Sequence, residues 1–391
     1  MTVDATAAED TGTALRRPVG FYVHYHGRGH RNRTLAILRE LATLDRPAAI
    51  LTSRMDGLDW PEPVREVIDV ACDIDDVPAA GQTRAEDSPA LHFAPLHTAT
   101  IRRRVHQLAE WFDRTNPAAL VVDVSCEVAM LARLASVPTV VMRQHGDRRD
   151  PAHETAYHAA DRLLAPFPER LEDELTPEWV REKTTYAAGF CRYADPPPDR
   201  EAARTSLGWS QPTVVVMSGR GGRGSSVAGV VAAAAATPDW QWVLVGLLDE
   251  DLATLPANVV SAGWVSDPLP MLAGADVVVS AGGHNSVMEL AHARARAIIR
   301  PEPRPFDEQV RKAAILDREG LAIVSSEWPA ADRWPALLRR ASQLDATRWA
   351  AITEGEQPGA AALAAAIEDV CRQSDAVAAS PAPHAAEPAG V

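Results

Sequence analysis

The sequence predicts an α/β protein of two domains, each built on a parallel β-sheet with helices on both faces. Short apolar, β-branched runs alternate along the chain with segments whose apolar residues recur at helical spacing, the pattern of β-α-β units. Several of these runs end in glycine or polar residues directly before a helix, as strand-to-helix turns do. The length of 391 residues suits two domains, each large enough for its own core.

In the first half, residues 19–26 are predicted to form a strand, Gly27-Arg28-Gly29-His30 a turn, and the leucine repeat that follows a helix. A second strand is expected at 48–52. The acidic, Pro-containing stretch 72–98 is typical of a long loop. The half continues with a helix at 98–112, a strand at 118–122 that ends at Asp123, a helix at 125–135 and a strand at 139–142.

In the second half, β-branched runs predict strands at 213–218, 242–247, 259–262, 275–280 and 321–324, and a helix at 334–344. The expected division of the chain follows from these elements and from a Pro-rich stretch at 196–198. It comprises a disordered leader (1–17), an N-terminal domain (18–184), a linker (185–212), a C-terminal domain (213–345), a C-terminal helix (346–372) and a disordered tail (373–391).

Composition and charge exclude several classes of protein. Apolar residues make up 46% and charged residues 24%, which is ordinary for a globular protein, and the net charge of −14 argues against a nucleic-acid binder. The four cysteines are far apart and form no Cys-x-x-Cys, which favours reduced thiols in the cytoplasm. Residues 1–17 have no apolar core of a secretory signal, and charged residues interrupt the apolar run 120–142. Any membrane contact is therefore expected to be peripheral.

The most informative stretch is 264–309, which contains a buried strand, a Gly282-Gly283 turn and a helix capped by Asn285 or Ser286. Free backbone N–H groups and the helix dipole at such a point suit a diphosphate. Glu289 lies one turn into the helix, where its carboxylate would accept hydrogen bonds from a ribose diol. Ser286-x-x-Glu289 is equally a capping box, and these residues alone leave both interpretations open.

The whole stretch resembles the nucleotide-sugar signature of GT-B glycosyltransferases: a Trp-containing turn, a Gly-rich turn with Asn-Ser-x-x-Glu, and an Asp-Gln-like end after proline. The resemblance implies two Rossmann-like domains that face each other across a cleft. It implies donor-binding roles for Trp264, Val265, Gly282, Gly283, His284, Asn285, Ser286, Glu289, Glu308 and Gln309. Ala281 replaces the histidine of the plant version, and the residues after Trp264 also depart from it, so base and sugar choice stay open.

The turn at Gly27–His30 resembles the first turn of the same superfamily, Gly-x-Gly-His-x-Asn, with Asn32 on its last position. His30 is therefore the candidate general base, and Asp123, at the end of another strand, is the carboxylate expected to orient it. The alternatives are a capping or phosphate-binding role for His30 and a helix N-cap role for Asp123. Candidate contacts to the acceptor or the sugar are His26, Gly29, Arg143 and His145, the last two by resemblance to peptidoglycan N-acetylglucosaminyltransferases.

The loop 219–224 matches Gly-x-Gly-x-x-Gly, which also invites a dinucleotide-dependent dehydrogenase. Its place in the second half and the late acidic residue, Asp249, favour a loop that faces the donor instead, through Gly219, Arg220, Gly221, Gly222 and Arg223. A purely structural glycine turn is the remaining alternative.

No metal site is expected. Asp73-Ile74-Asp75 lies in an acidic loop, and His153 and His158 are one residue too far apart for His-Glu-x-x-His. No cofactor is expected beyond the nucleotide sugar, because a helix dipole and arginines can neutralise a leaving diphosphate.

The resemblance implies a metal-independent, inverting transferase, with UDP favoured over dTDP. Its acceptor hydroxyl or amine would belong to a natural product or a cell-envelope compound, small or lipid-linked. We expect a cytoplasmic monomer or homodimer. Two alternatives remain: an isomerase of the UDP-N-acetylglucosamine 2-epimerase type, and a non-catalytic sugar-nucleotide-binding protein.

Overall fold

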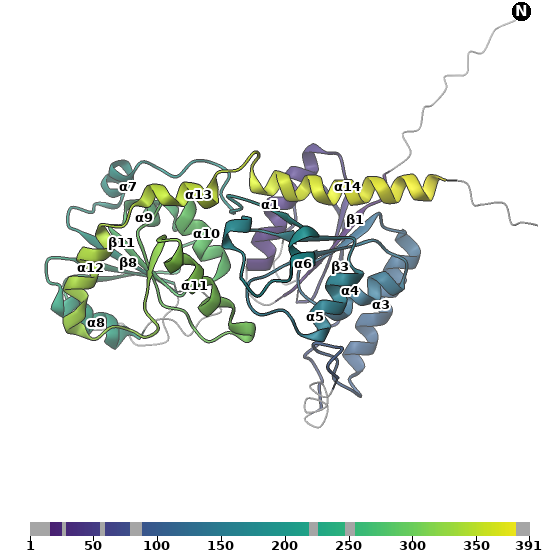
Figure 1. Cartoon of the computed structure of the whole chain (residues 1–391), viewed down its shortest axis with the longest axis horizontal. Helices are drawn as coiled ribbons and strands as arrows, with labels where there is room; N and C mark the ends of the chain where they lie inside the picture. Colours follow the sequence, from purple (N-terminus) through teal and green to yellow (C-terminus); the bar gives the residue numbers. More distant parts are fainter. Residues whose placement is uncertain are drawn as a thin grey trace, which may run out of the picture.

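The computed structural model describes residues 16–25, 29–54, 59–78, 88–218, 226–246 and 255–380. It consists of two α/β domains side by side along the long axis of the molecule (Figure 1). Every strand pairing within the two sheets is parallel. The fold class predicted from the alternation of strand and helix is thus confirmed.

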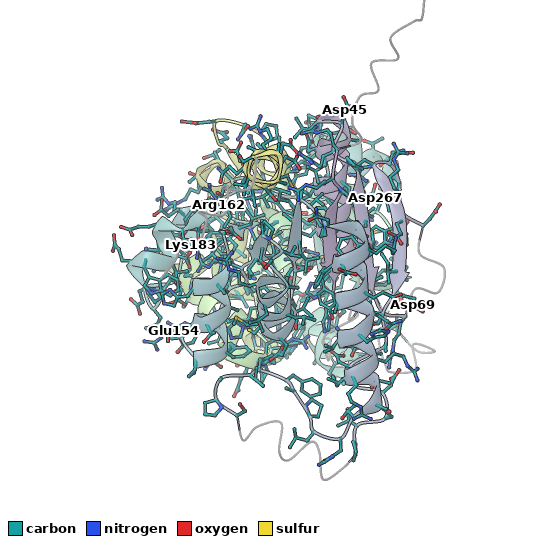
Figure 2. The ribbon with its side chains drawn as sticks, turned by 90° about the vertical axis from the view of Figure 1, so that its right-hand side faces the viewer. Asp45, Asp69, Glu154, Arg162, Lys183 and Asp267 are labelled. Atoms are coloured by element: carbon teal, nitrogen blue, oxygen red, sulfur yellow. The ribbon has the colours of Figure 1, made fainter. Side chains whose placement is uncertain are left out.

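The first domain contains a seven-stranded sheet in the order β3-β2-β1-β4-β5-β6-β7. Its strands are β1 (Val19–Val23), β2 (Ala48–Thr52), β3 (Val64–Asp69), β4 (Ala119–Val122), β5 (Thr139–Met142), β6 (Arg162–Ala165) and β7 (Thr184–Tyr186). The central strands are apolar and fully buried, whereas β3 is partly exposed at one edge. Figure 2 shows Asp69, at the end of β3, and Lys183, next to β7, on opposite sides of the domain, as this order requires.

Helices cover both faces of the first sheet, because successive side chains of a strand point to opposite faces. Phe21 packs in the core with α1 and Tyr22 in the core with α3. The helices are α1 (Gly29–Thr43), α3 (Ala99–Thr115), α4 (Cys126–Leu134), α5 (Pro151–Ala159) and α6 (Glu178–Glu182), with a short 3-10 turn, η1 (Glu169–Leu171). α1 and α4 follow β1 and β4 closely, so their first residues lie at the carboxyl edge of the sheet.

The second domain contains a six-stranded sheet in the order β10-β9-β8-β11-β12-β13. Its strands are β8 (Thr213–Met217), β9 (Gln241–Val245), β10 (Val259–Gly263), β11 (Val277–Ser280), β12 (Ala297–Ile299) and β13 (Ala322–Val324). Its helices are α7 (Arg200–Leu207), α8 (Val227–Ala236), α9 (Leu269–Gly274), α10 (His284–His292), α11 (Glu308–Arg318), α12 (Trp334–Ser342) and α13 (Ala350–Thr353), with 3-10 turns η2 (Pro305–Asp307), η3 (Ala331–Arg333) and η4 (Ala346–Trp349). α7 lies within the segment expected to be a linker.

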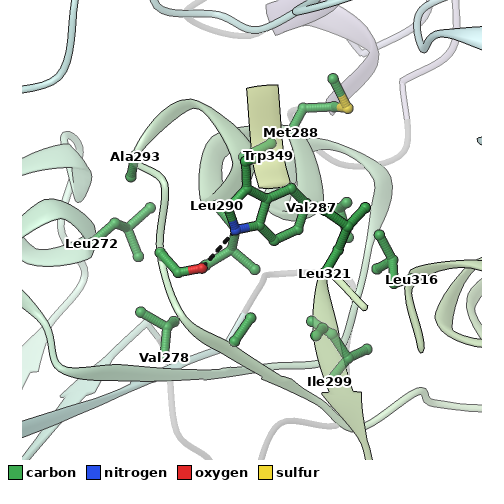
Figure 3. Close-up of a cluster of buried hydrophobic side chains, with 14 of the residues drawn as sticks. Leu272, Val278, Val287, Met288, Leu290, Ala293, Ile299, Leu316, Leu321 and Trp349 are labelled. Carbon is green, nitrogen blue, oxygen red and sulfur yellow. Dashed lines mark hydrogen bonds between the residues drawn. The ribbon is translucent and has the colours of Figure 1, made fainter. Parts of the chain in front are cut away.

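Trp349 lies in the core that supports α10. Figure 3 shows its ring among Leu290, Val287 and Leu321, and its indole N–H donates to the carbonyl of Ala295 at 2.8 Å. A buried indole N–H needs such a partner, so this bond sets the orientation of the ring. The packing holds α10 against β11 and β12, and thereby holds the turn that precedes α10.

The last helix, α14 (Gly359–Ala379), returns to the first domain and lies along it (Figure 1). Ile367 and Val370 are buried against α1, and Glu368 pairs with the buried Arg46 at 2.7 Å. The predicted helix 346–372 differs from this arrangement. Residues 346–353 form η4 and α13, and α14 continues into the segment expected to be disordered, because Asp375 pairs with Arg46 at 2.9 Å. None of the described helices combines the length and the apolar character needed to cross a membrane.

Candidate functional site

The order of strands places one crevice in each sheet. In the first sheet β1 lies between β2 and β4, and in the second sheet β8 lies between β9 and β11. Chain connections leave in opposite directions at such a point, and ligands of open α/β sheets bind outside the carboxyl ends of the strands there. The segments that follow β1 and β11 meet at a cavity of about 440 Å³ lined by residues of both domains.

One wall of the cavity comes from the first domain and the other from the second. The first domain contributes Gly29, His30, Asn32, Arg33 and Gln144, and Arg192 joins from the connecting segment. The second contributes Met217, Ser218, Val245, Gly246, Trp264, Val265, Ser266, Pro268, Gly283, His284, Asn285, Ser286, Glu289, Arg304, Glu308 and Gln309. A Cβ atom on Gly29 would lie 3.0 Å from Nδ2 of Asn285, so the two domains approach closely at this turn.

His30, at the start of α1, contacts Asp123, which follows β4, as the sequence analysis expected. Nδ1 of His30 lies 2.7 Å from Oδ2 of Asp123, and the guanidinium of Arg33 contacts Oδ1 of the same carboxylate. Burial by itself raises the pKa of Asp123, but the charges of Arg33 and His30 outweigh it and hold this pKa below its ordinary value. Asp123 is therefore an ionised hydrogen-bond acceptor at neutral pH.

The ionised carboxylate decides the tautomer of His30. A carboxylate only accepts hydrogen bonds, so in the neutral imidazole of His30 the proton lies on Nδ1 and the lone pair on Nε2. Arg33 lies 3.1 Å from Nδ1 but has a stronger acceptor in Asp123. The alternative N-cap role of Asp123 is taken by Ser125, whose hydroxyl accepts from the N–H of Val128 at 3.2 Å. The pair is thus arranged for Nε2 to accept a proton.

On the opposite wall, β11 leads through Gly282 into α10. Gly282 has φ of +79°, and a Cβ atom there would lie 2.8 Å from the side chain of Ile299, so the turn requires glycine. The helix begins at His284, and its N-cap is Gly283 and not Asn285 or Ser286 as expected. The residues of the first turn line the cavity, and no side chain caps their N–H groups, an arrangement that suits an anion.

Glu289 lines the cavity, and its Oε1 lies 2.8 Å from Nε of Arg192. The capping box is absent, because Ser286 lies inside the helix and no side chain caps it. Burial raises the pKa of Glu289, and the charge of Arg192 offsets only part of this effect. The carboxylate is thus held at the cavity wall by a cation and is available to hydroxyl donors.

His284 and the segment before α11 complete this wall. Burial, together with the charge of Lys312, holds the pKa of His284 well below its ordinary value, so this imidazole is neutral. Phe306 and Asp307 both have left-handed backbone conformations, with φ of 61° and 53°, directly before Glu308. Such conformations are strained for residues other than glycine and cluster at functional sites. Gln309 accepts from the backbone N–H of Glu302 at 2.9 Å, which fixes its amide at the cavity.

No family model matches the sequence. One curated protein, an uncharacterized glycosyltransferase of Methanosarcina acetivorans, is 30% identical over 94 residues, which are 23% of this chain and only 24% of that protein. Among solved structures, the spinosyn forosaminyltransferase SpnP matches 91% of this chain and 100% of its own with a TM-score of 0.67 at 16% identity. A UDP-glucosyltransferase from Polygonum tinctorium matches 92% of this chain and 100% of its own with a TM-score of 0.65 at 12% identity.

This chain has the GT-B fold. The similarity extends over 91% and 92% of the chain, and so includes both parallel sheets and the cavity lined by the two domains. The expected GT-B arrangement, two Rossmann-like domains facing each other across a cleft, is therefore confirmed.

Two residues expected at the GT-B cleft lie elsewhere. The guanidinium of Arg143 is buried inside the first domain, where it pairs with Glu172 at 2.6 Å and contacts Thr184 at 3.2 Å. His145 is also buried, donates from Nε2 to the carbonyl of Leu171 at 3.1 Å and packs on Phe167. Neither side chain lines the cavity. A carboxylate binds Arg143 and a carbonyl binds His145 inside the domain, and their position after β5 in the sequence did not indicate these partners.

Six predicted site residues, His26, Gly219, Arg220, Gly221, Gly222 and Arg223, lie outside the described residues. Their roles stay predictions. Ser218, the residue before the glycine loop, lines the cavity.

Sequence reasoning missed three arginines of the GT-B cleft, Arg33, Arg192 and Arg304. Arg33 lies three residues after His30, and residues at this spacing share one face of a helix. This spacing could have identified Arg33 from the sequence. Arg192 and Arg304 lie in irregular segments where no periodic pattern indicates a direction, so only the tertiary structure places them.

The residues considered for a metal have other partners. Asp73 and Asp75 lie near Arg104 and Arg54, at 3.4 and 2.8 Å. His153 contacts Asp150, and the ring of His158 stacks on Trp179 at 3.8 Å between centroids. Within the part of the chain that the structure describes, no three His, Cys, Asp or Glu side chains are grouped so as to hold a metal ion.

Proposed function

We propose that the protein is a metal-independent, inverting glycosyltransferase that moves a sugar from a nucleoside diphosphate sugar to a hydroxyl or amine. The observation that carries this proposal is the shared cavity of about 440 Å³. It has a carboxylate-oriented imidazole, His30, on one wall and an uncapped helix N-terminus with two glycines on the other. One wall suits a general base and the other a diphosphate.

In the proposed reaction with a hydroxyl acceptor, Nε2 of His30 takes the proton of the acceptor hydroxyl. The hydroxyl oxygen attacks the anomeric carbon of the sugar. The bond from that carbon to the diphosphate breaks, and the electron pair leaves with the diphosphate at Gly283 and the first turn of α10. Asp123 holds the imidazole in the required tautomer and stabilises the imidazolium that forms. Attack from the side opposite the leaving group inverts the anomeric centre.

The remaining residues of the cavity bind the donor in this proposal. Trp264 and Val265 contact the base, and Glu289 accepts from the ribose hydroxyls. Glu308 and Gln309 contact the sugar. The helix dipole and nearby arginines neutralise the diphosphate, so the reaction does not depend on a metal ion.

UDP is the favoured nucleotide, as in the UDP-glucosyltransferase of the same fold. A natural-product or cell-envelope acceptor and a cytoplasmic location belong to the same proposal.

The direct test is a thermal-shift and calorimetric titration with UDP and dTDP, followed by turnover assays with the sugar derivatives of the nucleotide that binds. We expect one of the two nucleoside diphosphates to bind. In the turnover assay, the corresponding nucleotide sugar should be cleaved to free nucleoside diphosphate only when an acceptor is present. If neither nucleotide binds, the proposal is refuted. Conversion of the nucleotide sugar to its epimer without an acceptor would identify an isomerase instead.

A further inference from the structure

A second cavity, of about 50 Å³, lies in the first domain next to the candidate catalytic pair. Asp123 lines this small cavity, His30 lines the large cavity, and Gln144 lines both. The His30–Asp123 pair therefore stands between the two cavities. A molecule with one end in the small cavity could therefore extend past Gln144 into the large cavity and reach the imidazole of His30.

The walls of the small cavity come from β5, from α4 and α5, and from the loops that follow β4 and β5, together with His92 from the loop before α3. The backbone N–H groups of His92 and Phe93 donate to Oε1 of Glu127 at 2.5 and 2.9 Å, which holds this loop against α4. Ser125, also in the wall, has φ of 145°, a strained value for a residue with a side chain. The cavity thus lies where the loops after β4 and β5 meet α4 and α5.

Arg148 is the only arginine or lysine among the described residues that line this cavity. Among the described residues, no carboxylate oxygen lies within 4.0 Å of its guanidinium, whereas the neighbouring Arg143 and Arg149 are each paired with an acid. The ring of Phe306, from the second domain, lies over the guanidinium at 4.0 Å from the ring centroid. Arg148 is therefore held in place without an ion pair.

Within the described part of the chain, Arg148 makes three side-chain hydrogen bonds, all to neutral groups. Nε donates to the carbonyl of His145 at 3.4 Å, one terminal nitrogen to Nε2 of His153 at 3.3 Å, and the other to Oε1 of Gln144 at 3.2 Å. A guanidinium has five N–H groups. These three bonds leave two N–H groups, one on each terminal nitrogen. A carboxylate accepts two N–H groups in a bidentate pair.

Among the described residues, the other ionisable groups at the cavity form no ion pair with Arg148. Burial and the charge of Arg148 lower the pKa of His153 to about 4, so its ring is neutral at neutral pH. Asp150 lies behind His153, bonded to its Nδ1 at 2.7 Å. Asp123 is already engaged by His30 and Arg33.

We infer that the acceptor is a small hydroxylated carboxylate, whose carboxylate binds Arg148 in the second cavity while its hydroxyl group faces His30. The inference rests on the proposed function and names the acceptor class for it. The hydroxyl loses its proton to His30, its oxygen bonds to the anomeric carbon, and the nucleoside diphosphate leaves with the electron pair. The carboxylate keeps its charge throughout, so it serves recognition only.

The test compares two probes of similar shape, 4-hydroxybenzoate and 4-hydroxybenzamide, by calorimetry on the full chain with and without UDP. We expect the carboxylate to bind at least ~10-fold more tightly than the amide, because a charge-assisted pair with Arg148 is stronger than a neutral hydrogen bond. Arg148→Gln should abolish this preference, and Arg148→Lys should keep part of it. Arg149→Gln, on the exposed neighbour, is the matched control and should change nothing.

Equal affinity for the two probes, including no binding of either, would overturn the inference, as would a preference that persists in Arg148→Gln. UDP affinity in each variant verifies that the protein is folded and separates the two hypotheses. If UDP binds normally but the probes are not distinguished, only the acceptor class is wrong. If UDP does not bind to the unmodified protein, the proposed function fails whatever the probes do.

Discussion

Nδ1 of His30 and Oδ2 of Asp123 are 2.7 Å apart, although 93 positions separate the two residues in the sequence. They meet because β1 and β4 are neighbours in the sheet, with Tyr22 paired to Val122, so the segments after both strands begin at the same edge. Parallel pairing of non-consecutive strands thus creates the contact, and the proposed chemistry depends on it.

The first prediction concerns this pair. His30→Ala should lower turnover by about 10²-fold or more while UDP affinity stays nearly unchanged, because the imidazole acts on the acceptor and not on the nucleotide. Steady-state kinetics and calorimetry measure the two quantities. His106→Ala, on the exposed face of α3, is the matched control. Retained turnover in His30→Ala would remove this residue from the mechanism.

The second prediction concerns Glu289. Glu289→Ala should weaken UDP binding by about 10-fold or more, because a hydrogen bond to a charged group contributes about 1.5–3 kcal/mol. The loss should appear in nucleotide affinity measured by calorimetry, and the exposed Glu354→Ala should bind normally. If UDP affinity is unchanged in Glu289→Ala, the ribose role is refuted.

The third prediction concerns Lys312, which is 1% exposed and lies 3.8 Å from Glu308. Burial lowers the pKa of Lys312 to about 8, against its ordinary value of 10.5. Between these two values the unfolded chain binds more protons than the native protein, so the contribution of Lys312 to stability rises with pH in that window. Below pH 8 the burial penalty is present in full.

Lys312→Met removes the titrating group and keeps a side chain of similar length. The unmodified protein should therefore gain stability relative to Lys312→Met from pH 8 to 10.5, by up to about 3 kcal/mol at about 1.36 kcal/mol per pKa unit. Urea denaturation at a series of pH values measures the difference. A constant difference across this window would show that Lys312 titrates normally in the native protein.

The fourth prediction concerns α14. Ile367 is fully buried between this helix and the first sheet, so Ile367→Ala should destabilise the protein by about 2–5 kcal/mol. Val377, on the same helix, is 75% exposed, and Val377→Ala should change the free energy of unfolding by less than about 0.5 kcal/mol. Chemical denaturation of both variants checks this. Equal effects would show that the helix does not pack as described.

Strand type, helix type and the approximate place of the site follow from local patterns. The β-branched runs that became β1, β4, β8 and β11 are buried on both faces, so their apolar character is continuous and easily recognised. β3 was not predicted, because a partly exposed edge strand mixes apolar and charged residues. β7 was missed for another reason, since Thr-Thr-Tyr is too short to show a period.

By itself, the sequence determined the α/β class, the two domains, the helix start at His30 and the glycine turn at Gly282. Each of these depends on residues that are close together in the chain. Only the tertiary structure decided which charges meet. It paired Arg33 with Asp123, Arg192 with Glu289 and Arg143 with Glu172, and among the described residues it left Arg148 without an acid. The physical reason is that a buried charge is stabilised by whichever opposite charge or hydrogen-bond partner the packing of distant segments brings to it, and local sequence does not encode that partner.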